Sequence, residues 1–260
     1  MTLGVRFSGS MALLVSVADA DEATAALEGG ADVIDAKDPT GGALGPVRPE
    51  VLTEITATVR GRAVVTAALG DASDVHRTER LAAEYSGRGA SLVKVGFAGV
   101  ADARRVDALL AAAVRGCVAG SGVVAVAYAD CSYAACIDPW SLVEVAVRSG
   151  ARGVLVDTAD KLGDGLTSLW NAAQMASWVA EARSWGLIAG VAGKLGESDF
   201  AVAREAGADV IGVRGAACVG ERTSRVSADR VRLLRARLDD RSILVGAPAI
   251  ALVAESGSSV

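Results

Sequence analysis

Short apolar runs alternate with amphipathic segments along almost the whole chain. The apolar runs predict eight strands, at residues 13–17, 33–37, 63–68, 92–95, 123–128, 154–157, 187–192 and 210–213. The segments between them carry apolar residues at helical spacing and predict helices at 21–28, 49–60, 78–87, 102–115, 139–149, 169–185, 198–206 and 228–238. Strands that are apolar on both faces need cover on both sides, which indicates a parallel sheet surrounded by helices.

Eight strand–helix units in about 240 residues predict an α/β chain that folds as a (β/α)8 TIM barrel in one domain, residues 1–260. A doubly wound open sheet is the alternative, but no GxGxxG motif follows the first strand. Residues 1–10 are interpreted as a short extension, and residues 239–260 as a C-terminal tail. The apolar run 243–254 is too short to span a bilayer, so we expect it to pack on the barrel or on a neighbouring subunit.

A Gly-Ala dipeptide recurs between a predicted helix and the next strand, beginning at Gly30, Gly89, Gly150 and Gly207. The spacings are 59, 61 and 57 residues, each about two strand–helix units. Asp35 and Lys94 lie five residues after such a glycine. Lys37 and Asp157 lie seven residues after one. Odd offsets share one face of a strand, so the four side chains should meet at the carboxyl ends of the second, fourth and sixth strands.

Composition narrows the range of functions. The net charge is −5 and no run of Lys and Arg is present, so we expect neither a nucleic-acid surface nor a membrane partner. His76, predicted to lie on a loop, is the single histidine, which excludes Ser-His-Asp, Cys-His and multi-histidine zinc sites. The four cysteines form no CxxC motif and predict a reduced, cytoplasmic protein. No metal or cofactor is expected.

Lys37 and Asp35, at the end of an apolar strand, have two interpretations. They form a structural ion pair, or the lysine forms a Schiff base; considered alone, the ion pair is the commoner case. The convergence of two lysines and two aspartates favours chemistry. A lysine becomes a nucleophile when burial or a second cation lowers its pKa, and Lys94 or Lys161 could supply that cation. The aspartates could then hold the amines and transfer protons.

The loops after the seventh and eighth strands are the usual phosphate-binding address of this barrel. Here they contain Gly193 and Lys194, then Arg214, Gly215 and Ala216. Glycines let backbone amides approach an anion, and the adjacent cations add positive potential. These five residues therefore predict a sugar-phosphate substrate.

Two further features keep open interpretations. Tyr128, followed by Asp130 at the end of the fifth strand, is a candidate for proton transfer, but it is equally well explained as a tyrosine packing at the barrel rim. The glycines after the second strand form either a lid or a simple turn; they are Gly41, Gly42 and Gly45.

Several segments together resemble one known family. They are LVS from Leu14, GADVIDAKDP from Gly30, LG from Leu44, VKVG from Val93, AYAD from Ala127, VDTA from Val156 and GVRGAAC from Gly212. In this order they resemble (5-formylfuran-3-yl)methyl phosphate synthase, also called 4-(hydroxymethyl)-2-furancarboxaldehyde-phosphate synthase. The match runs from about residue 13 to 238. Loops 130–133 and 162–165 and the chain beyond residue 239 carry little of the family pattern.

The resemblance implies a lyase that condenses two molecules of glyceraldehyde 3-phosphate into a phosphorylated furan aldehyde, with loss of phosphate and water. It implies that Lys37 forms the Schiff base and that Asp35, Lys94, Asp157 and Lys161 complete the active site. A class I aldolase acting on another phosphorylated carbonyl is the alternative enzyme, and a non-catalytic sugar-phosphate-binding protein is the alternative outside catalysis. A homo-oligomer is expected.

Overall fold

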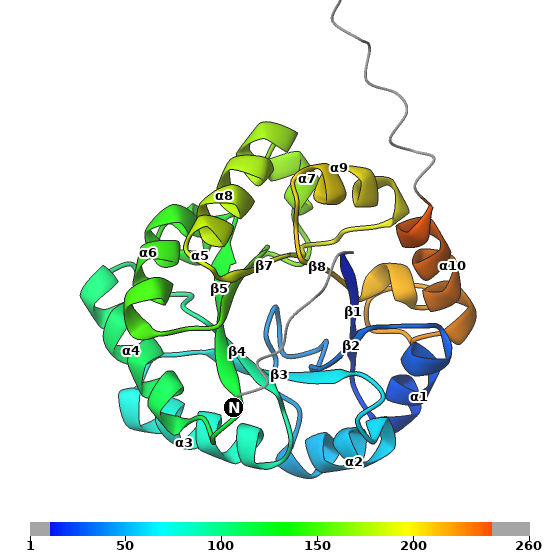
Figure 1. The fold of residues 1–260 in the computed structure, drawn as a ribbon, viewed down its shortest axis with the longest axis horizontal. Coiled ribbons are helices and arrows are strands. Elements are labelled where there is room, and N and C mark those ends of the chain that lie inside the picture. The colour runs from blue at the N-terminus through cyan, green and yellow to red at the C-terminus, as the bar shows by residue number, and fades with distance from the viewer. Residues whose placement is uncertain (1–10, 241–260) are drawn as a thin grey trace, which may run out of the picture.

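The computed structural model describes residues 11–240, and both the N-terminal extension and the apolar run 243–254 lie outside this range. Eight parallel strands close into a barrel in which each strand pairs with its neighbours in the chain and β8 pairs with β1. Helices surround this ring on the outside, as Figure 1 shows. The TIM barrel predicted from the alternating pattern is therefore confirmed.

The strands agree closely with the predicted positions. They are β1 (Ala12–Val17), β2 (Val33–Ala36), β3 (Val64–Asp71), β4 (Leu92–Gly96), β5 (Gly122–Tyr128), β6 (Gly153–Asp157), β7 (Ile188–Val191) and β8 (Val210–Val213). The α-helices are α1 (Ala20–Glu28), α2 (Pro49–Val59), α3 (Val75–Gly87), α4 (Ala103–Gly116), α5 (Cys131–Ala134), α6 (Pro139–Ser149), α7 (Leu166–Leu169), α8 (Ala172–Ser184), α9 (Phe200–Glu205) and α10 (Ala228–Asp239). Two short 3-10 turns, η1 (Glu197–Asp199) and η2 (Gly215–Ala217), follow β7 and β8.

The recurring Gly-Ala dipeptide is a helix stop. All four glycines have a positive φ, between 76° and 100°, which L-residues other than glycine adopt only with strain. The amide of each following alanine donates to the carbonyl five residues earlier, the bond that closes a Schellman motif. The helices before β2, β4, β6 and β8 therefore end in the same way, and the chain enters each of these strands in the same phase.

Three predicted features differ from the structure. The predicted helix 169–185 begins at Ala172, because Asn171 forms a capping box with Gln174 and starts α8 there, whereas residue 169 ends the separate short helix α7. His76 was predicted to lie on a loop, but it lies in the first turn of α3, which Asp74 caps by accepting from the amide of Arg77. The short helix α5 was not predicted.

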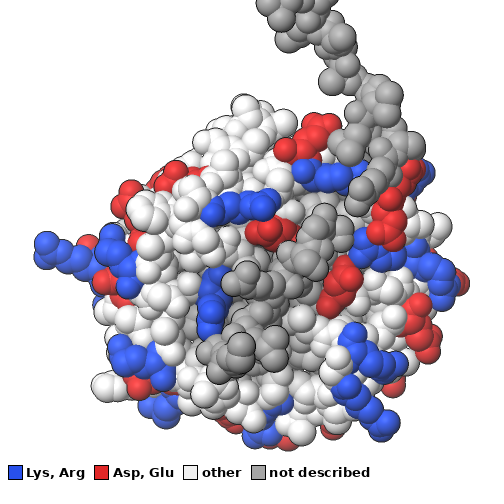
Figure 2. All heavy atoms as spheres, in the orientation of Figure 1, with Lys and Arg blue, Asp and Glu red and all other residues white. Residues whose placement is uncertain are grey.

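Apolar side chains fill both the space between the strands and the surrounding helices and the interior of the barrel. One large buried cluster, which includes Leu13, Ile34 and Val93, joins the strands to the helices. Alternate strand residues such as Leu14 and Leu155 belong to smaller separate clusters. Around the periphery of the face seen in Figure 2, basic and acidic side chains are mixed. Among residues 11–240, no helix is long and apolar enough to cross a membrane.

Candidate active site

A cavity of about 570 Å³ opens at the carboxyl ends of the strands. Its lining comes from the ends of β1, β2, β4 and β6 and from the loops after β6, β7 and β8. This is the end of the barrel where active sites of this fold lie. The cavity brings together residues far apart in sequence; its polar lining includes Ser16, Lys37, Lys94, Asp157, Lys161, Lys194, Arg214, Glu221 and Arg222.

Lysines are concentrated in this cavity. The chain has 26 basic residues, of which four are lysines, so the remaining 22 are arginines. All four lysines line this one cavity. An arginine guanidinium stays protonated in proteins, whereas a lysine amine can lose its proton when it is buried. Surface cations are thus supplied by arginine, and every amine of a lysine side chain is placed at the carboxyl end of the barrel. The scarcity of lysine is visible in the sequence, although no motif marks it.

Asp35 is fully buried and holds Lys94. The Nζ of Lys94 lies 2.6 Å from Oδ2 of Asp35, and both side chains are almost completely shielded from solvent. Ser16 donates to Oδ2 at 2.9 Å, and Thr66 donates to Oδ1 at 2.6 Å. Burial by itself would raise the pKa of Asp35, but the ammonium groups of Lys94 and Lys37 outweigh it and hold that pKa below its usual value. Asp35 is therefore a carboxylate.

Ser16 and Thr66 are site residues that sequence reasoning missed. Both are register partners of Asp35, on the strands to either side of β2. Residues paired in this way project on the same side of the sheet, so their hydroxyls reach the Asp35 carboxylate. The sequence shows a hydroxyl residue in each of the two neighbouring strands. Without the register between the strands, it does not show that these hydroxyls lie beside Asp35.

Asp157 and Lys161 form a second pair, at the end of β6. Nζ of Lys161 lies 2.7 Å from Oδ1 of Asp157, which also accepts from the amide of Thr158 at 2.8 Å. Burial would raise the pKa of Asp157, but Lys161 and Lys37 together lower it below its usual value. The buried hydroxyl of Thr158 has no hydrogen-bond partner among residues 11–240.

Asp130 shapes the loop that carries Lys161. Its Oδ1 accepts from the amide of Ala159 at 2.7 Å, and its Oδ2 accepts from the amide of Asp160 at 2.8 Å. These two bonds fix the turn that returns Lys161 over Asp157. Asp130 follows the proton-transfer candidate Tyr128 in the sequence, and the geometry indicates a positioning role for Asp130.

Tyr128 has a different environment from the lysines. Its hydroxyl donates to Oδ1 of Asp71 at 2.8 Å, and it does not line the cavity. Burial, together with the charge of Asp71, raises the pKa of the phenol well above its usual value. The structure thus favours the tyrosine packing at the rim over proton transfer.

Lys37 lies between the two pairs. Its side chain is 7% exposed and makes no hydrogen bond or ion pair within 4.0 Å with any of residues 11–240. Burial lowers the pKa of Lys37 from its ordinary 10.5 to about 8; Asp157 and Asp35 act against this, and Lys94 and Lys161 reinforce it. Of the two causes considered from the sequence, burial is thus the larger, and the neighbouring cations lower the pKa of Lys37 further. At pH 7 the neutral fraction of an amine with a pKa of about 8 is roughly 300 times that of an amine with the ordinary pKa of 10.5.

The predicted phosphate-binding residues all line the cavity. The amides of Gly193 and Lys194 donate no hydrogen bond within the described part of the chain, and Nζ of Lys194 donates to the carbonyl of Gly163. Gly215 and Ala216 open the turn η2. Arg214 is different, because its guanidinium is enclosed by Glu22 and by backbone carbonyls. Contact between Arg214 and a phosphate would require one of these bonds to break.

The glycine-rich loop after β2 is a tight turn. The amide of Asp38 donates to the carbonyl of Gly45 at 2.8 Å, and the amide of Gly41 donates back to the carbonyl of Asp38 at 3.3 Å. A Cβ added to Gly41 would lie 2.8 Å from the Cα of Gly45. The glycines thus permit the two sides of the turn to touch, which favours the turn over the lid.

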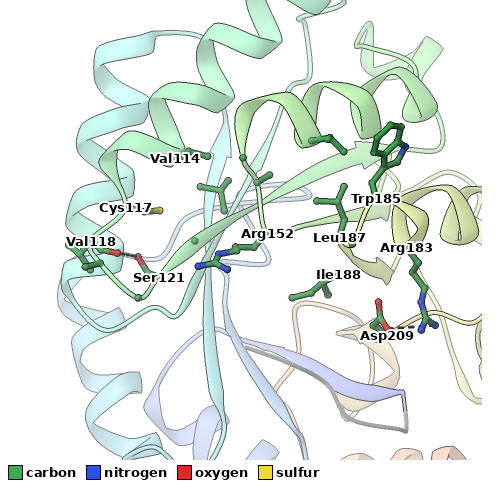
Figure 3. A pocket seen from close by; sticks show the side chains of 18 residues that line it. Val114, Cys117, Val118, Ser121, Arg152, Arg183, Trp185, Leu187, Ile188 and Asp209 are labelled. Atoms are coloured by element: carbon green, nitrogen blue, oxygen red, sulfur yellow. Dashed lines mark hydrogen bonds and ion pairs between the residues drawn. The ribbon is translucent and has the colours of Figure 1, made fainter. Parts of the chain in front are cut away.

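A second and larger hollow, of about 1010 Å³, lies at the opposite end of the barrel, around the starts of β5, β6 and β7. Figure 3 shows it, with Trp185 at its edge and Arg183 beside Asp209 at 3.7 Å. None of the predicted site residues lines it. The amino ends of barrel strands contribute to stability rather than catalysis, so the smaller cavity is the candidate active site. Residues 11–240 include no group of three or more His, Cys, Asp or Glu side chains that could hold a metal ion.

Comparison with known proteins gives consistent matches. The family model described as 4-HFC-P synthase matches residues 13–235. The (5-formylfuran-3-yl)methyl phosphate synthase of Methanothermobacter thermautotrophicus is 36% identical, over 88% of this chain and 99% of that protein. The enzyme of the same name from Methanocaldococcus jannaschii is 34% identical, over 86% of this chain and 98% of that protein.

Solved structures with low sequence identity share the fold. A crystal structure of KGPDC from Streptococcus mutans superposes with a TM-score of 0.61 at 16% identity, covering 88% of this chain and 97% of that one. At this identity the likeness concerns the barrel alone.

Proposed function

Because this chain belongs to the 4-HFC-P synthase family, we propose that it condenses two molecules of glyceraldehyde 3-phosphate into (5-formylfuran-3-yl)methyl phosphate through a Schiff base on Lys37. Phosphate and water are released, so the reaction is that of a carbon–oxygen lyase. The observation that carries the proposal is Lys37 itself, a buried amine without a hydrogen bond or ion pair among residues 11–240, set between two carboxylate–ammonium pairs.

The chemistry begins with a carbonyl that the amine can attack. Neutral Lys37 adds to the aldehyde carbon of one glyceraldehyde 3-phosphate, and loss of water gives the protonated imine. Removal of the proton from the neighbouring carbon gives an enamine that expels the phosphate from the third carbon, which leaves an enol still bound to Lys37. The terminal carbon of this enol attacks the carbonyl carbon of the second molecule, which has isomerised to the ketone. The free hydroxyl of that ketone closes the ring, loss of two water molecules gives the furan, and hydrolysis of the imine frees Lys37 and the aldehyde.

The two ion pairs have distinct roles in this proposal. Asp157 has the largest electrostatic effect of any single charge on the pKa of Lys37, so the Asp157–Lys161 pair is placed to exchange protons with the imine. Asp35 is fixed by three side-chain donors, and the Asp35–Lys94 pair thus provides a preorganised charge pair that acts on the Lys37 amine. The net charge of the cavity is positive, which suits a substrate with phosphate groups.

Reductive trapping tests the proposal. The protein is incubated with glyceraldehyde 3-phosphate and borohydride, and the modified residue is located by mass spectrometry. In a parallel incubation without borohydride, a furan aldehyde is detected by its near-ultraviolet absorbance. The expected result is an adduct on Lys37 and a furan product, both absent in Lys37→Arg, which keeps the charge but cannot form an imine.

The same experiment separates the alternatives. An adduct without a furan product would indicate a class I aldolase acting on another phosphorylated carbonyl. Binding without an adduct on any lysine would indicate a sugar-phosphate-binding protein and would remove the mechanism. A cytoplasmic location, a homo-oligomeric assembly and activity without a metal or cofactor remain predictions from the sequence.

A further inference from the structure

Six basic side chains line the active-site cavity, and the four lysines among them already have a partner or a proposed catalytic role. Lys94 and Lys161 are each held by a buried carboxylate, and Lys37 is the proposed nucleophile. Lys194 is exposed and donates to a backbone carbonyl. The remaining two are arginines, Arg214 directly before η2 and Arg222 on the loop between η2 and α10. A phosphate group is best recognised by a guanidinium with free donors, so the two must be compared.

Arg214 has no donor left. Its Nε donates to the carbonyl of Arg222 at 2.9 Å. One terminal nitrogen donates to Glu22 and to the carbonyl of Ser16, at 3.0 Å for the carbonyl, and the other donates to Glu22 at 3.2 Å and to the carbonyl of Ser224 at 2.9 Å. These bonds use all five N–H groups of a guanidinium. Both charges of the Arg214–Glu22 pair are buried, so separating them would be costly.

Arg222 is the opposite case. It is half-buried, and of its five N–H groups one donates to a described residue, from Nη2 to the carbonyl of Gly42 at 3.1 Å. No carboxylate among residues 11–240 lies within 4.0 Å of its guanidinium. Burial lowers the pKa of Arg222, and the charge of Asp157 raises it. Asp157 acts on the pKa of Lys37 as well, so both cations interact with the same carboxylate of the cavity. Arg222 therefore carries a positive charge with donors to spare.

The backbone around Arg222 is held in place. Its own carbonyl accepts from Nε of Arg214, and its side chain crosses to the glycine turn after β2. Gly215 lies beside it, since a Cβ at that position would be 3.8 Å from the Cβ of Arg222. The guanidinium of Arg222 is thus positioned between the β2 turn and the β8 loop, at the edge of the cavity.

We propose that Arg222, rather than Arg214, is the guanidinium that binds a phosphate group in this cavity, and that Arg214 holds the loop from which Arg222 projects. This inference rests on the proposed function in taking a phosphorylated compound as the substrate. The amides of Gly193 and Lys194 and the Lys194 ammonium lie along the same cavity and complete the anion site.

Inorganic phosphate is a suitable probe because its binding requires no turnover. Isothermal titration of the full chain should give saturable binding, weakened about 10-fold to 100-fold in Arg222→Gln, because a hydrogen bond to a charged group contributes about 1.5–3 kcal/mol. Arg222→Lys keeps the charge and should lose less. Arg225→Gln is the matched control: this arginine lies three residues further on, is exposed and pairs with Asp19 outside the cavity, so binding should be unchanged.

Chemical modification gives a second readout on the unaltered protein. Phenylglyoxal reacts with arginine, and mass spectrometry can follow Arg222 and Arg225 separately. Phosphate should protect Arg222 and leave Arg225 reactive. Equal phosphate binding by Arg222→Gln and the unaltered protein, absence of saturable phosphate binding to the unaltered protein, or equal protection of both arginines would overturn the inference. A furan product in the trapping experiment is judged separately, so either proposal can fail while the other stands.

Discussion

Lys37→Met should stabilise the protein at neutral pH while abolishing its activity. Methionine has nearly the length of the lysine side chain but carries no charge that must be kept out of water. The pKa of Lys37 falls from 10.5 to about 8 on folding, so at pH 7 the folded chain holds this proton less tightly than the unfolded chain. Each unit corresponds to about 1.4 kcal/mol, and the difference at pH 7 is about 3 kcal/mol in favour of the variant.

The sign of the pH dependence is a sharper test than the size of the effect. Between pH 8 and pH 10.5 the unfolded chain binds a proton at residue 37 that the folded chain does not, so the stability of the unaltered protein rises with pH through this window relative to the variant. The advantage of Lys37→Met should therefore shrink, from about 3 kcal/mol at pH 7 to about 1 kcal/mol at pH 9.5. Titrating groups that do not interact with residue 37 affect both proteins alike and cancel in the difference.

Urea unfolding at pH 7.0, 8.5 and 9.5, followed by circular dichroism, measures this difference directly. Lys194→Met is the matched control, because the Lys194 ammonium is exposed and its removal should bring no comparable gain. A variant no more stable than the unaltered protein at pH 7, or a difference that does not shrink as the pH rises, would refute the argument that burial depresses the pKa of Lys37.

Three further results are expected. The kcat/KM for furan formation should rise with pH and level off above about 8, as the Lys37 amine loses its proton; a flat profile between pH 6 and 9 would contradict this. Asp130→Ala removes the two bonds to the β6 loop, so kcat should fall about 10-fold to 100-fold with a smaller change in KM, and an unchanged kcat would argue against a positioning role. Gly30→Ala should destabilise the fold by about 1–2 kcal/mol in urea unfolding, because φ is +90° and Arg235 lies 3.2 Å from the added Cβ. Gly87→Ala, at the last residue of α3 with open space around it, should instead stabilise it by about 0.4–1 kcal/mol, because alanine reduces the conformational freedom of the unfolded chain.

The barrel could be predicted because its signals are local. Apolar runs mark the strands, and a glycine at each of four helix ends sets the phase of the strand that follows. The same phase predicts that Asp35, Lys94 and Asp157 share a face, since side chains alternate along a strand. The start of α8 was also encoded locally, in the capping box of Asn171 and Gln174, but the apolar pattern placed that start three residues too early.

The rest of the site depends on contacts between distant parts of the chain. The role of Thr66 follows from its register with Asp35, which no single strand specifies. Arg214 lies where a phosphate ligand is expected, but its guanidinium is paired with the carboxylate of Glu22, which is 192 residues away in sequence. Arg222 gave no signal in the sequence beyond being one arginine among many. Its free donors become visible only when the partners of the other cations are known.

The distribution of basic residues follows from the same chemistry. A nucleophilic amine must be neutral part of the time, which an arginine cannot achieve and a buried lysine can. The site therefore accepts the cost of burying Lys37, and it limits that cost with Asp35 and Asp157, which raise the pKa again but stop short of its ordinary value. Without the two carboxylates the amine would be more often neutral, but it would lack groups to exchange protons with the imine that we propose on Lys37. Without Lys94 and Lys161, the carboxylates of Asp35 and Asp157 would be buried without their closest partners. The two lysines therefore keep these carboxylates ionised beside residue 37.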